Sequence, residues 1–372
     1  MTRFHQLHRN KHSLFLLVLW QSAWLLSLSN NISVWALPGK QDIQPWNRLY
    51  VTNFLSNNVS VVDLNAGKVM ATIPVGNGPT GMAVSPDVEQ VYVANSLSGT
   101  VSVISTAINQ VTDTIPIPSF YRASAPFGLA ITHDGAKVYA TNLDDGTVRV
   151  IDTQSKKVVD TITKAYDWAL RYIAISPDGE YAWAIGTGDG KVSVIRTDDN
   201  EVVAKIWGLP SARHMAFTPD GTRAYITGEK FSHVYVIDTK TYSLLTVIYF
   251  PAGATTNTLD ISQDGRFAMI SNFYGNPAKL DTDPKSPTYH KILAEVPPKS
   301  FYQYCIVISP DGRFAYLSNQ ADRGSTPNSI NIIDLNPQSI THDTIINSIP
   351  VGQQPWGVAI VRQQPNNTET DK

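Results

Sequence analysis

Short apolar segments alternate with turn-forming residues along most of the chain. Between residues 48 and 361 these segments are rich in β-branched side chains and alternate in polarity, as in Val148-Arg149-Val150-Ile151-Asp152. Gly, Asp, Asn or Pro separates one segment from the next. This pattern predicts short β-strands joined by tight turns.

The strand pattern repeats along the chain. The string Tyr50-Val51-Thr52-Asn53 recurs with substitutions at intervals of 42–47 residues, and the other six copies begin at Tyr92, Tyr139, Trp183, Tyr225, Met269 and Tyr316. Each copy predicts four strands, which we call A to D. Strand A ends in an Asp-Gly turn, where glycine accepts the positive φ that a hairpin needs. Four antiparallel strands per 42–47 residues are typical of one propeller blade.

The two ends of the repeat region complete each other. The chain enters its first blade at strand B, from Arg48, and finishes with a lone strand A at residues 356–361. Strands A and B match in number only if these two segments pair. We therefore predict an all-β, seven-bladed β-propeller with four antiparallel strands per blade, whose ring is closed by the C-terminal strand. Closure removes the open edges that promote aggregation.

The period, the Tyr-Val-Thr-Asn core and the Ser-Pro-Asp-Gly turns at residues 176–179 and 309–312 resemble those of the YVTN β-propeller repeat family. The resemblance covers residues 48–361. It implies the fold strongly, and it implies a binding or scaffold protein of the periplasm or cell surface.

The first 36 residues have a different character. A basic start with Arg3, Arg9 and Lys11 precedes apolar runs at residues 14–20 and 23–26, and the segment ends in the small residue Ala36. This order is typical of a secretory signal peptide cleaved after Ala36. The alternative is an uncleaved anchor helix, which polar residues at 21–22 and 29–31 disfavour.

These observations predict a signal peptide over residues 1–36 and an N-terminal lead-in over 37–47. The propeller then spans 48–361, and a disordered tail spans 362–372. We expect a secreted or periplasmic monomer with no stable membrane insertion after cleavage.

The net charge limits the kinds of partner that we expect, and the cysteine content limits the disulfides that can form. Removing residues 1–36 takes away three basic residues and no acidic one, so the formal net charge falls from -2 to -5. A mildly acidic surface without basic runs argues against nucleic acid as a partner. The one cysteine, Cys305, cannot form an internal disulfide.

Common catalytic signatures are missing from the sequence. There is no Cys-x-x-Cys-His, His-Glu-x-x-His or Gly-x-Ser-x-Gly string, and the histidines have no paired spacing. We therefore expect no metal and no other cofactor.

The start of strand A varies between blades in a patterned way. Three copies have Pro-x-Gly there, beginning at Pro79, Pro126 and Pro355. Four consecutive copies do not: Leu170-Arg171-Tyr172, Ala212-Arg213-His214, Thr256-Asn257-Thr258 and Gln303-Tyr304-Cys305. In addition, Asp260 stands where five of the other six copies carry Ala. The D–A connections share one pole of the ring with the B–C connections, and loops on a rigid scaffold often carry function.

We therefore predict a ligand site at this pole, formed by Arg171, Arg213, His214, Asn257, Asp260, Tyr304, Trp168 and Trp356. The two arginines could hold a carboxylate or phosphate bidentately. His214 and Asp260 are the candidate catalytic residues. Aromatic side chains at the rim suit stacking on sugars or burial of an apolar ligand. The structural alternative is that the arginines pair with carboxylates between blades and the aromatic rings fill the channel.

Two functional classes follow. The first is an exported binding or scaffold protein whose small-molecule or protein ligand sits at the mouth. The alternative is a secreted enzyme that acts there on a small anionic, aromatic or apolar metabolite, as a lactonase-like hydrolase, lyase or cyclase. The Arg/His/Asp cluster favours the enzyme, whereas the missing metal and nucleophile signatures favour the binding protein.

Overall fold

A computed structural model describes residues 47–119, 125–163, 165, 169–188, 190–251, 254–297, 302–320 and 328–361. All of them belong to one compact unit, Ile43–Lys372. The predicted signal peptide and C-terminal tail, and the predicted lead-in except for Asn47, lie outside the described residues. In the part of the chain that the structure describes, no helix is both long and apolar enough to cross a membrane.

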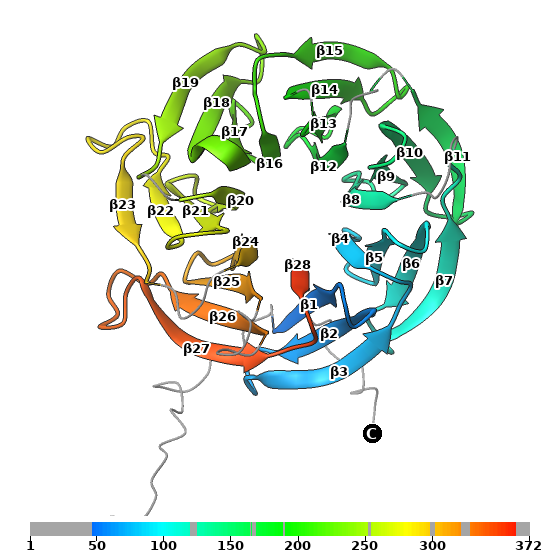
Figure 1. The fold of residues 1–372 in the computed structure, drawn as a ribbon, viewed down its shortest axis with the longest axis horizontal. Coiled ribbons are helices and arrows are strands. Elements are labelled where there is room, and N and C mark those ends of the chain that lie inside the picture. Colours follow the sequence, from blue (N-terminus) through cyan, green and yellow to red (C-terminus); the bar gives the residue numbers. More distant parts are fainter. Residues whose placement is uncertain are drawn as a thin grey trace, which may run out of the picture. The chain divides into compact units, whose positions relative to one another are not determined.

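The described residues form seven antiparallel four-stranded sheets that surround a common axis as blades (Figure 1). The predicted seven-bladed β-propeller is therefore confirmed. Blade 1 combines β28 with β1 to β3, and blades 2 to 7 follow in chain order from β4 to β27.

The strands A lie around the axis: β28 (Pro355–Val361), β4 (Pro79–Val84), β8 (Pro126–Ile131), β12 (Leu170–Ile175), β16 (Ala212–Phe217), β20 (Thr256–Ile261) and β24 (Gln303–Ile308). The strands B come next: β1 (Arg48–Asn53), β5 (Gln90–Asn95), β9 (Lys137–Asn142), β13 (Tyr181–Gly186), β17 (Arg223–Gly228), β21 (Phe267–Asn272) and β25 (Phe314–Asn319). The strands C are β2 (Asn58–Asp63), β6 (Thr100–Ser105), β10 (Thr147–Asp152), β14 (Lys191–Arg196), β18 (His233–Asp238), β22 (Ala278–Asp281) and β26 (Ser329–Asp334). The outer strands D are β3 (Lys68–Pro74), β7 (Gln110–Pro116), β11 (Lys157–Ile162), β15 (Val202–Ile206), β19 (Leu244–Tyr249), β23 (Ile292–Glu295) and β27 (Thr344–Pro350).

The C-terminal strand closes the ring as predicted. β28 pairs antiparallel with β1, with Leu49 opposite Ile360 and Val51 opposite Val358. Segments about 300 residues apart in the chain therefore share one blade, and the ring depends on both ends.

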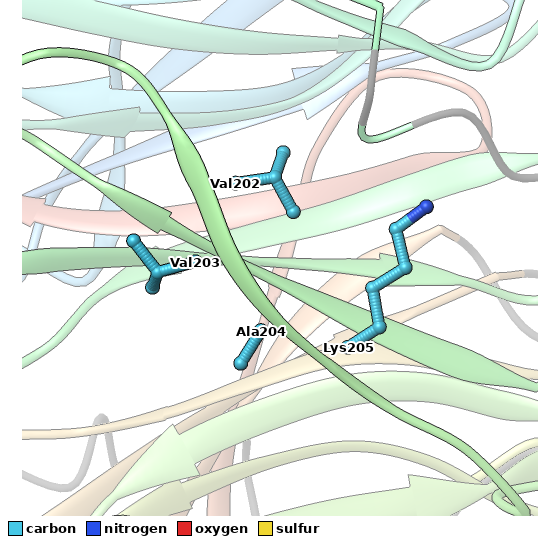
Figure 2. A pocket seen from close by; sticks show the side chains of 4 residues that line it. All are labelled: Val202, Val203, Ala204 and Lys205. Atoms are coloured by element: carbon cyan, nitrogen blue, oxygen red, sulfur yellow. The ribbon is translucent and has the colours of Figure 1, made fainter.

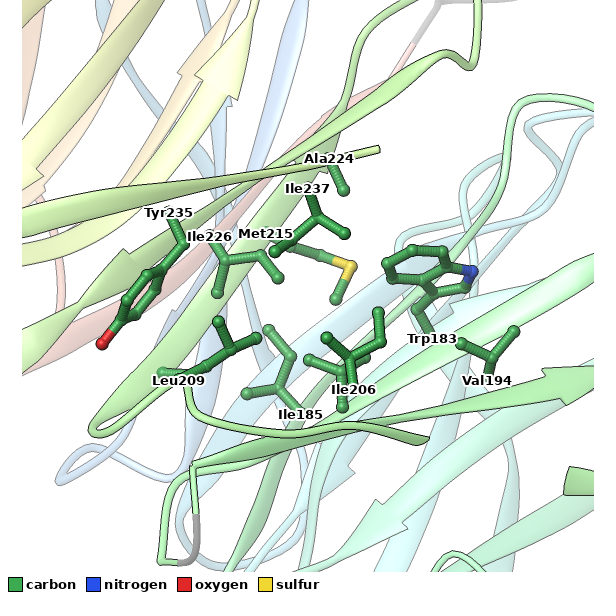
Figure 3. Packing of buried hydrophobic residues seen from close by; sticks show 12 residues of the cluster. Trp183, Ile185, Val194, Ile206, Leu209, Met215, Ala224, Ile226, Tyr235 and Ile237 are labelled. Atoms are coloured by element: carbon green, nitrogen blue, oxygen red, sulfur yellow. The ribbon is translucent and has the colours of Figure 1, made fainter. Parts of the chain in front are cut away.

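Burial follows the position of each strand in its blade. Strands B and C are buried almost throughout, whereas strands D alternate between exposed and partly buried residues. The core consequently lies between blades rather than within one. In the contact of blades 4 and 5, Trp183 packs against Met215, Ile237 and their neighbours (Figure 3).

The first residue of the repeated Tyr-Val-Thr-Asn string joins one blade to the next. The Tyr50 hydroxyl donates to Asn109 Oδ1 at 2.5 Å, and the Tyr139 hydroxyl donates to Asn200 Oδ1 at 2.7 Å. Both asparagines lie in the C–D turn of the following blade and have positive φ, which Asn tolerates better than most residues. Where Trp183 replaces Tyr, its ring contacts Tyr242 of the next C–D turn instead.

The hydroxyl of the string makes a second inter-blade connection. Thr52 Oγ1 accepts a hydrogen bond from Gly357 N in its own blade and donates to Thr80 O in the next, both at 2.8 Å. Asn53 Nδ2 donates to Ser60 Oγ within the blade. The repeated residues are therefore committed to the scaffold, and the repeat specifies the ring rather than a ligand.

The predicted Asp-Gly turns are also present. In blade 4, Ser176 Oγ donates to Asp178 Oδ1 at 2.5 Å, and Gly179 has a φ of 79°. The same hydroxyl–Asp bond recurs in other A–B turns, so this pole of the ring is uniform.

Candidate functional site

The residues that replace Pro-x-Gly lie at the start of four strands A that are consecutive around the axis, β12, β16, β20 and β24 (Figure 1). We call the second residue of each strand A its rim position and the third and fifth its axial positions. A strand rises roughly 3.3 Å per residue, so the fifth residue lies about 10 Å from the rim position along the strand.

Arg171 is a rim residue that lies against an aromatic ring. Its Cζ lies 5.4 Å from the centroid of the Phe127 ring, and its buried Nε has no hydrogen-bond partner. Among the described residues, no carboxylate lies within ion-pair distance of it. Burial lowers the pKa of Arg171, and the nearby charge of Arg213 lowers it further. A guanidinium in these surroundings attracts an anion.

Arg213 occupies the next rim position and has one acidic partner. Its NH1 lies 2.9 Å from Glu229 Oε2, and Glu229 begins a 3-10 helix, η1 (Glu229–Phe231), in the B–C connection of the same blade. The arginine side chain is 12% exposed and the glutamate 34%. Among the described rim residues, two guanidiniums therefore share one carboxylate, whose charge also acts on Arg171.

Tyr304 and Trp356 complete the rim on the other side. Their rings lie 4.6 Å apart, and Trp356 also contacts Phe127 edge to face at 5.7 Å. Burial raises the pKa of Tyr304, and the charge of Arg213 opposes that rise. The structure thus brings four predicted rim residues into one connected arrangement.

His214 lies one residue deeper than the rim and contacts Tyr172 of blade 4, with the two ring planes tilted by 38°. The two ring centroids are 3.8 Å apart. His214 Nδ1 accepts a hydrogen bond from Leu259 N at 3.4 Å, so the neutral ring carries its proton on Nε2. Burial lowers the pKa of His214 to about 3, and the charge of Arg213 adds to the effect. At neutral pH this histidine is a hydrogen-bond donor through Nε2 rather than a base.

Asp260 lies deeper again and has the properties of a base. Its Oδ2 accepts from Ile308 N at 2.8 Å and its Oδ1 from Ile261 N at 2.9 Å. Burial raises the pKa of Asp260 to about 6, although these two hydrogen bonds oppose the rise. A carboxylate with a pKa near neutrality can take up and return a proton at physiological pH.

The axial residues interact electrostatically with one another. Burial raises the pKa of the Tyr172 phenol, and the charges of Cys305 and Asp260 contribute to the rise. Burial also raises the pKa of the Cys305 thiol to about 12, which leaves this cysteine protonated and a poor nucleophile. Tyr172, His214, Asp260 and Cys305 therefore form one axial group in which Asp260 is the ionised member at neutral pH.

Two predicted site residues have other placements. Asn257 is almost fully buried, and its Nδ2 donates to Gln303 O of blade 7 at 2.7 Å, so its amide joins two blades. Trp168 lies outside the described residues.

Three residues of the arrangement, Tyr172, Cys305 and Glu229, escaped the sequence analysis as site candidates. Tyr172 occupies a position where three copies carry glycine, and that substitution was a usable signal. Glu229 lies in a connection that does not repeat, so no aligned copy marks it as unusual.

Hollows elsewhere on the described surface do not include these residues. One of about 460 Å³ follows the outer strand β15 and is lined by Val202, Val203, Ala204 and Lys205 (Figure 2). Another of about 480 Å³ lies at the opposite pole, by the A–B turns of blades 6 and 7. Within the described ranges, no group of three or more His, Cys, Asp or Glu residues could hold a metal ion.

Comparison with known families identifies the propeller. A family model described as "Lactonase, 7-bladed beta-propeller" matches residues 62–203 and 169–279, which together exceed half of the chain. The chain belongs to the lactonase seven-bladed β-propeller family. The narrower YVTN assignment is compatible with this match and stays a prediction. Among curated proteins, none matches the chain.

Solved structures share the fold of this lactonase-family propeller at low identity. The periplasmic gluconolactonase of Pseudomonas aeruginosa is 21% identical, with a TM-score of 0.68 over 84% of this chain and 98% of that one. Hydrazine synthase of Kuenenia stuttgartiensis is 22% identical, with a TM-score of 0.66 over 79% of this chain and 93% of that one. Identities this low establish a common fold and no more.

Proposed function

We propose that this lactonase-family propeller is an exported hydrolase that opens a small lactone at the D–A mouth. The observation that carries the proposal is Arg171, a guanidinium with no ion-pair partner among the described residues, beside a second arginine at the rim of a mouth that also contains Asp260, whose pKa is raised to about 6. Family membership favours hydrolysis over the lyase and cyclase alternatives.

In this proposal the rim residues bind the substrate, and the axial residues carry out the reaction. Arg171 and Arg213 bind an anionic group of the substrate, because a guanidinium fork matches a carboxylate or phosphate. The rim position of a strand lies about 10 Å from its fifth residue along the strand. A small substrate held at the rim by its anionic end can therefore present its reactive end to the axial group.

The axial group supplies the chemistry of ring opening. Asp260 takes a proton from water as the oxygen adds to the lactone carbonyl, and the Nε2–H of His214 and the hydroxyl of Tyr172 donate to the resulting oxyanion. The tetrahedral intermediate then expels the ring oxygen, which takes the proton held by Asp260. The product is a hydroxy acid, and one water is consumed.

Export is part of the same proposal. The basic start and apolar runs within residues 1–36 support a signal peptide. An exported hydrolase would meet its substrate in the periplasm or outside the cell.

A lactone panel with paired variants tests the function. Acid release should be measured by pH-stat for sugar, alkyl and aryl lactones, with wild type and with Arg171→Ala and Arg213→Ala. We expect one lactone class to be turned over and each variant to lose at least tenfold in kcat/KM. Arg196→Ala is the matched control, since it removes the same charge from an exposed ion pair in a C–D turn.

The outcomes separate the two functional classes. Turnover that both rim variants leave unchanged would move the reaction away from this mouth. If the mouth binds ligands and no lactone is opened, the chain is a binding protein and the hydrolase proposal is wrong.

A further inference from the structure

A series of aromatic rings occupies much of the D–A pole. Seven rings from blades 1, 3, 6 and 7 touch one another in succession, and we call them the aromatic belt: Phe54, Phe127, Phe273, Tyr274, Tyr302, Tyr304 and Trp356. Trp356 is its centre, with ring centroids 5.2 Å from Phe54, 5.7 Å from Phe127 and 4.6 Å from Tyr304. From Tyr304 the belt continues to Phe273 at 5.4 Å.

The belt meets the two arginines at both of its rim ends. Phe127 lies under the guanidinium of Arg171, and burial raises the pKa of Tyr304 while the charge of Arg213 opposes that rise. The mouth therefore has an aromatic side, formed by blades 6, 7, 1 and 3, and a cationic side, formed by blades 4 and 5.

Most neutral polar groups at the rim are already engaged, although Asn257 Oδ1 has no hydrogen-bond partner among the described residues. Asn257 Nδ2 donates to Gln303 O, and Thr80 Oγ1 donates to Phe127 O at 3.0 Å. The side chain of Gln303 accepts from Asn272 N through Oε1 and donates to Gly275 O through Nε2. A polyhydroxylated ligand needs a partner for each hydroxyl that it buries, because an unpaired buried hydroxyl is costly. These amides and this hydroxyl already serve the scaffold.

We propose that the ligand of this mouth has a flat aromatic or conjugated body and one anionic group, so that the substrate is an aryl lactone bearing a carboxylate rather than a polyhydroxylated sugar lactone. The aromatic belt contacts the flat body, since rings offer dispersion and edge-to-face contacts without directional hydrogen bonds. Arg171 and Arg213 bind the carboxylate. This inference rests on the proposed function for its reactive group and on the rim alone for its recognition.

Binding can be measured apart from turnover. The mature propeller should be titrated by calorimetry with 2-naphthoate, with its neutral amide 2-naphthamide, and with gluconate as the polyhydroxylated carboxylate. We expect 2-naphthoate to bind at least tenfold more tightly than either of the others. Equal or tighter binding of gluconate, equal binding of the amide, or no binding of any probe would each overturn the inference.

Variants assign the binding to the two sides of the mouth. Trp356→Leu and Arg171→Gln should each weaken 2-naphthoate binding at least tenfold while the melting temperature changes little. Phe127→Leu provides a second test of the belt if Trp356→Leu does not fold. Tyr249→Leu, which changes a 73% exposed aromatic residue on outer strand β19, should leave binding unchanged. An unchanged Kd in a folded belt variant would contradict the proposal.

The two proposals can fail separately. If 2-naphthoate binds as expected and no lactone is opened, the recognition inference stands and the hydrolase proposal falls. If a sugar lactone is opened and gluconate binds more tightly, the hydrolase proposal stands and this inference falls.

Discussion

His214 and Tyr172, from neighbouring blades, lie in ring contact, with centroids 3.8 Å apart and ring planes tilted by 38°. Both stand where three other strands A carry glycine. In those copies a Cβ would lie 2.4–2.6 Å from a carbonyl oxygen of the next strand A, as at Gly81, Gly128 and Gly357. Backbone contact thus joins blades 1 to 4 at this level, and a pair of polar rings takes its place between blades 4 and 5. One side of the axis is therefore chemically different from the other.

Tyr172→Phe removes the hydroxyl group of Tyr172 and keeps its ring, so this variant tests the contribution of the hydroxyl alone. The ring contact is retained, so the free energy of unfolding should change by no more than about 0.5 kcal/mol, the usual scale for a substitution that disturbs no packing. Loss of one oxyanion donor should lower kcat roughly 10²–10³-fold. Lactone hydrolysis and thermal melting check both effects, with Tyr242→Phe in a C–D turn as the control. An unchanged kcat would remove Tyr172 from the mechanism.

Asp260→Asn should abolish the pH dependence of hydrolysis near neutrality. Burial raises the pKa of Asp260 to about 6, so the basic form that accepts a proton accumulates as pH rises through 6. Wild-type kcat/KM should therefore increase between pH 5 and 7, and the variant should lose about 10²–10⁴-fold and become flat.

The ionisation of Asp260 has the opposite effect on stability, because the free energy of unfolding should fall over the pH range in which the activity rises. The native pKa lies above that of the unfolded chain, so the native state binds more protons, and this contribution to stability is lost as pH rises from about 4 through 6. Melting curves of Asp260→Asn should lack this decline. A variant that keeps the wild-type pH–rate profile would exclude Asp260 as the base.

We expect that breaking the ion pair of Asp145 and Arg149 lowers the free energy of unfolding more than breaking an exposed ion pair of the scaffold. The side chain of Asp145 is 0% exposed and that of Arg149 1%, and Arg149 NH2 lies 2.6 Å from Asp145 Oδ2. Arg149 also donates to Pro118 O. Asp145→Ala leaves a buried guanidinium without its carboxylate and should cost about 3–5 kcal/mol in urea unfolding. Asp199→Ala, which breaks an exposed pair with Arg196, should cost about 0–1 kcal/mol. Equal costs would contradict this assignment.

Deletion of residues 355–372 should destabilise the entire ring. β28 supplies strand A of blade 1, and its loss exposes the inner edge of β1 and breaks the contact with the neighbouring strands A. We expect a lower melting temperature together with association of the opened ring, since free strand edges pair readily. Deletion of residues 362–372 alone is the control. An unchanged melting temperature in the longer deletion would refute the dependence on closure.

The mature protein should begin at Leu37. The small residue Ala36 ends the apolar N-terminal segment, which places the cleavage site there. N-terminal sequencing of the exported protein tests this directly. Recovery of the intact chain in the membrane fraction would favour the anchor helix.

The sequence by itself determined the ring, because the interactions that build it recur at a fixed spacing. Tyr50 and Tyr139 reach the C–D turn of the next blade in the same way, and Thr52 links two blades with a hydroxyl that most copies keep. Because these interactions recur from blade to blade, the residues that make them can be recognised in the sequence alone. The number of strands A and B at the two ends of the chain predicted how the ring closes.

The same comparison of copies found the rim arginines, Tyr304, His214 and Asp260, since each departs from its aligned neighbours. It could not tell a ligand contact from a scaffold contact: Asn257 departs from the pattern as clearly as Arg171, yet its amide binds Gln303 O between two blades. Only the tertiary structure decided that Arg213 has Glu229 as a partner, that Arg171 has no ion-pair partner among the described residues, and that seven rings from four blades form one belt. These contacts occur once, between segments that lie at no fixed distance along the chain. They therefore leave no periodic pattern in the sequence. They form only when the fold brings the D–A and B–C connections to one pole of the ring.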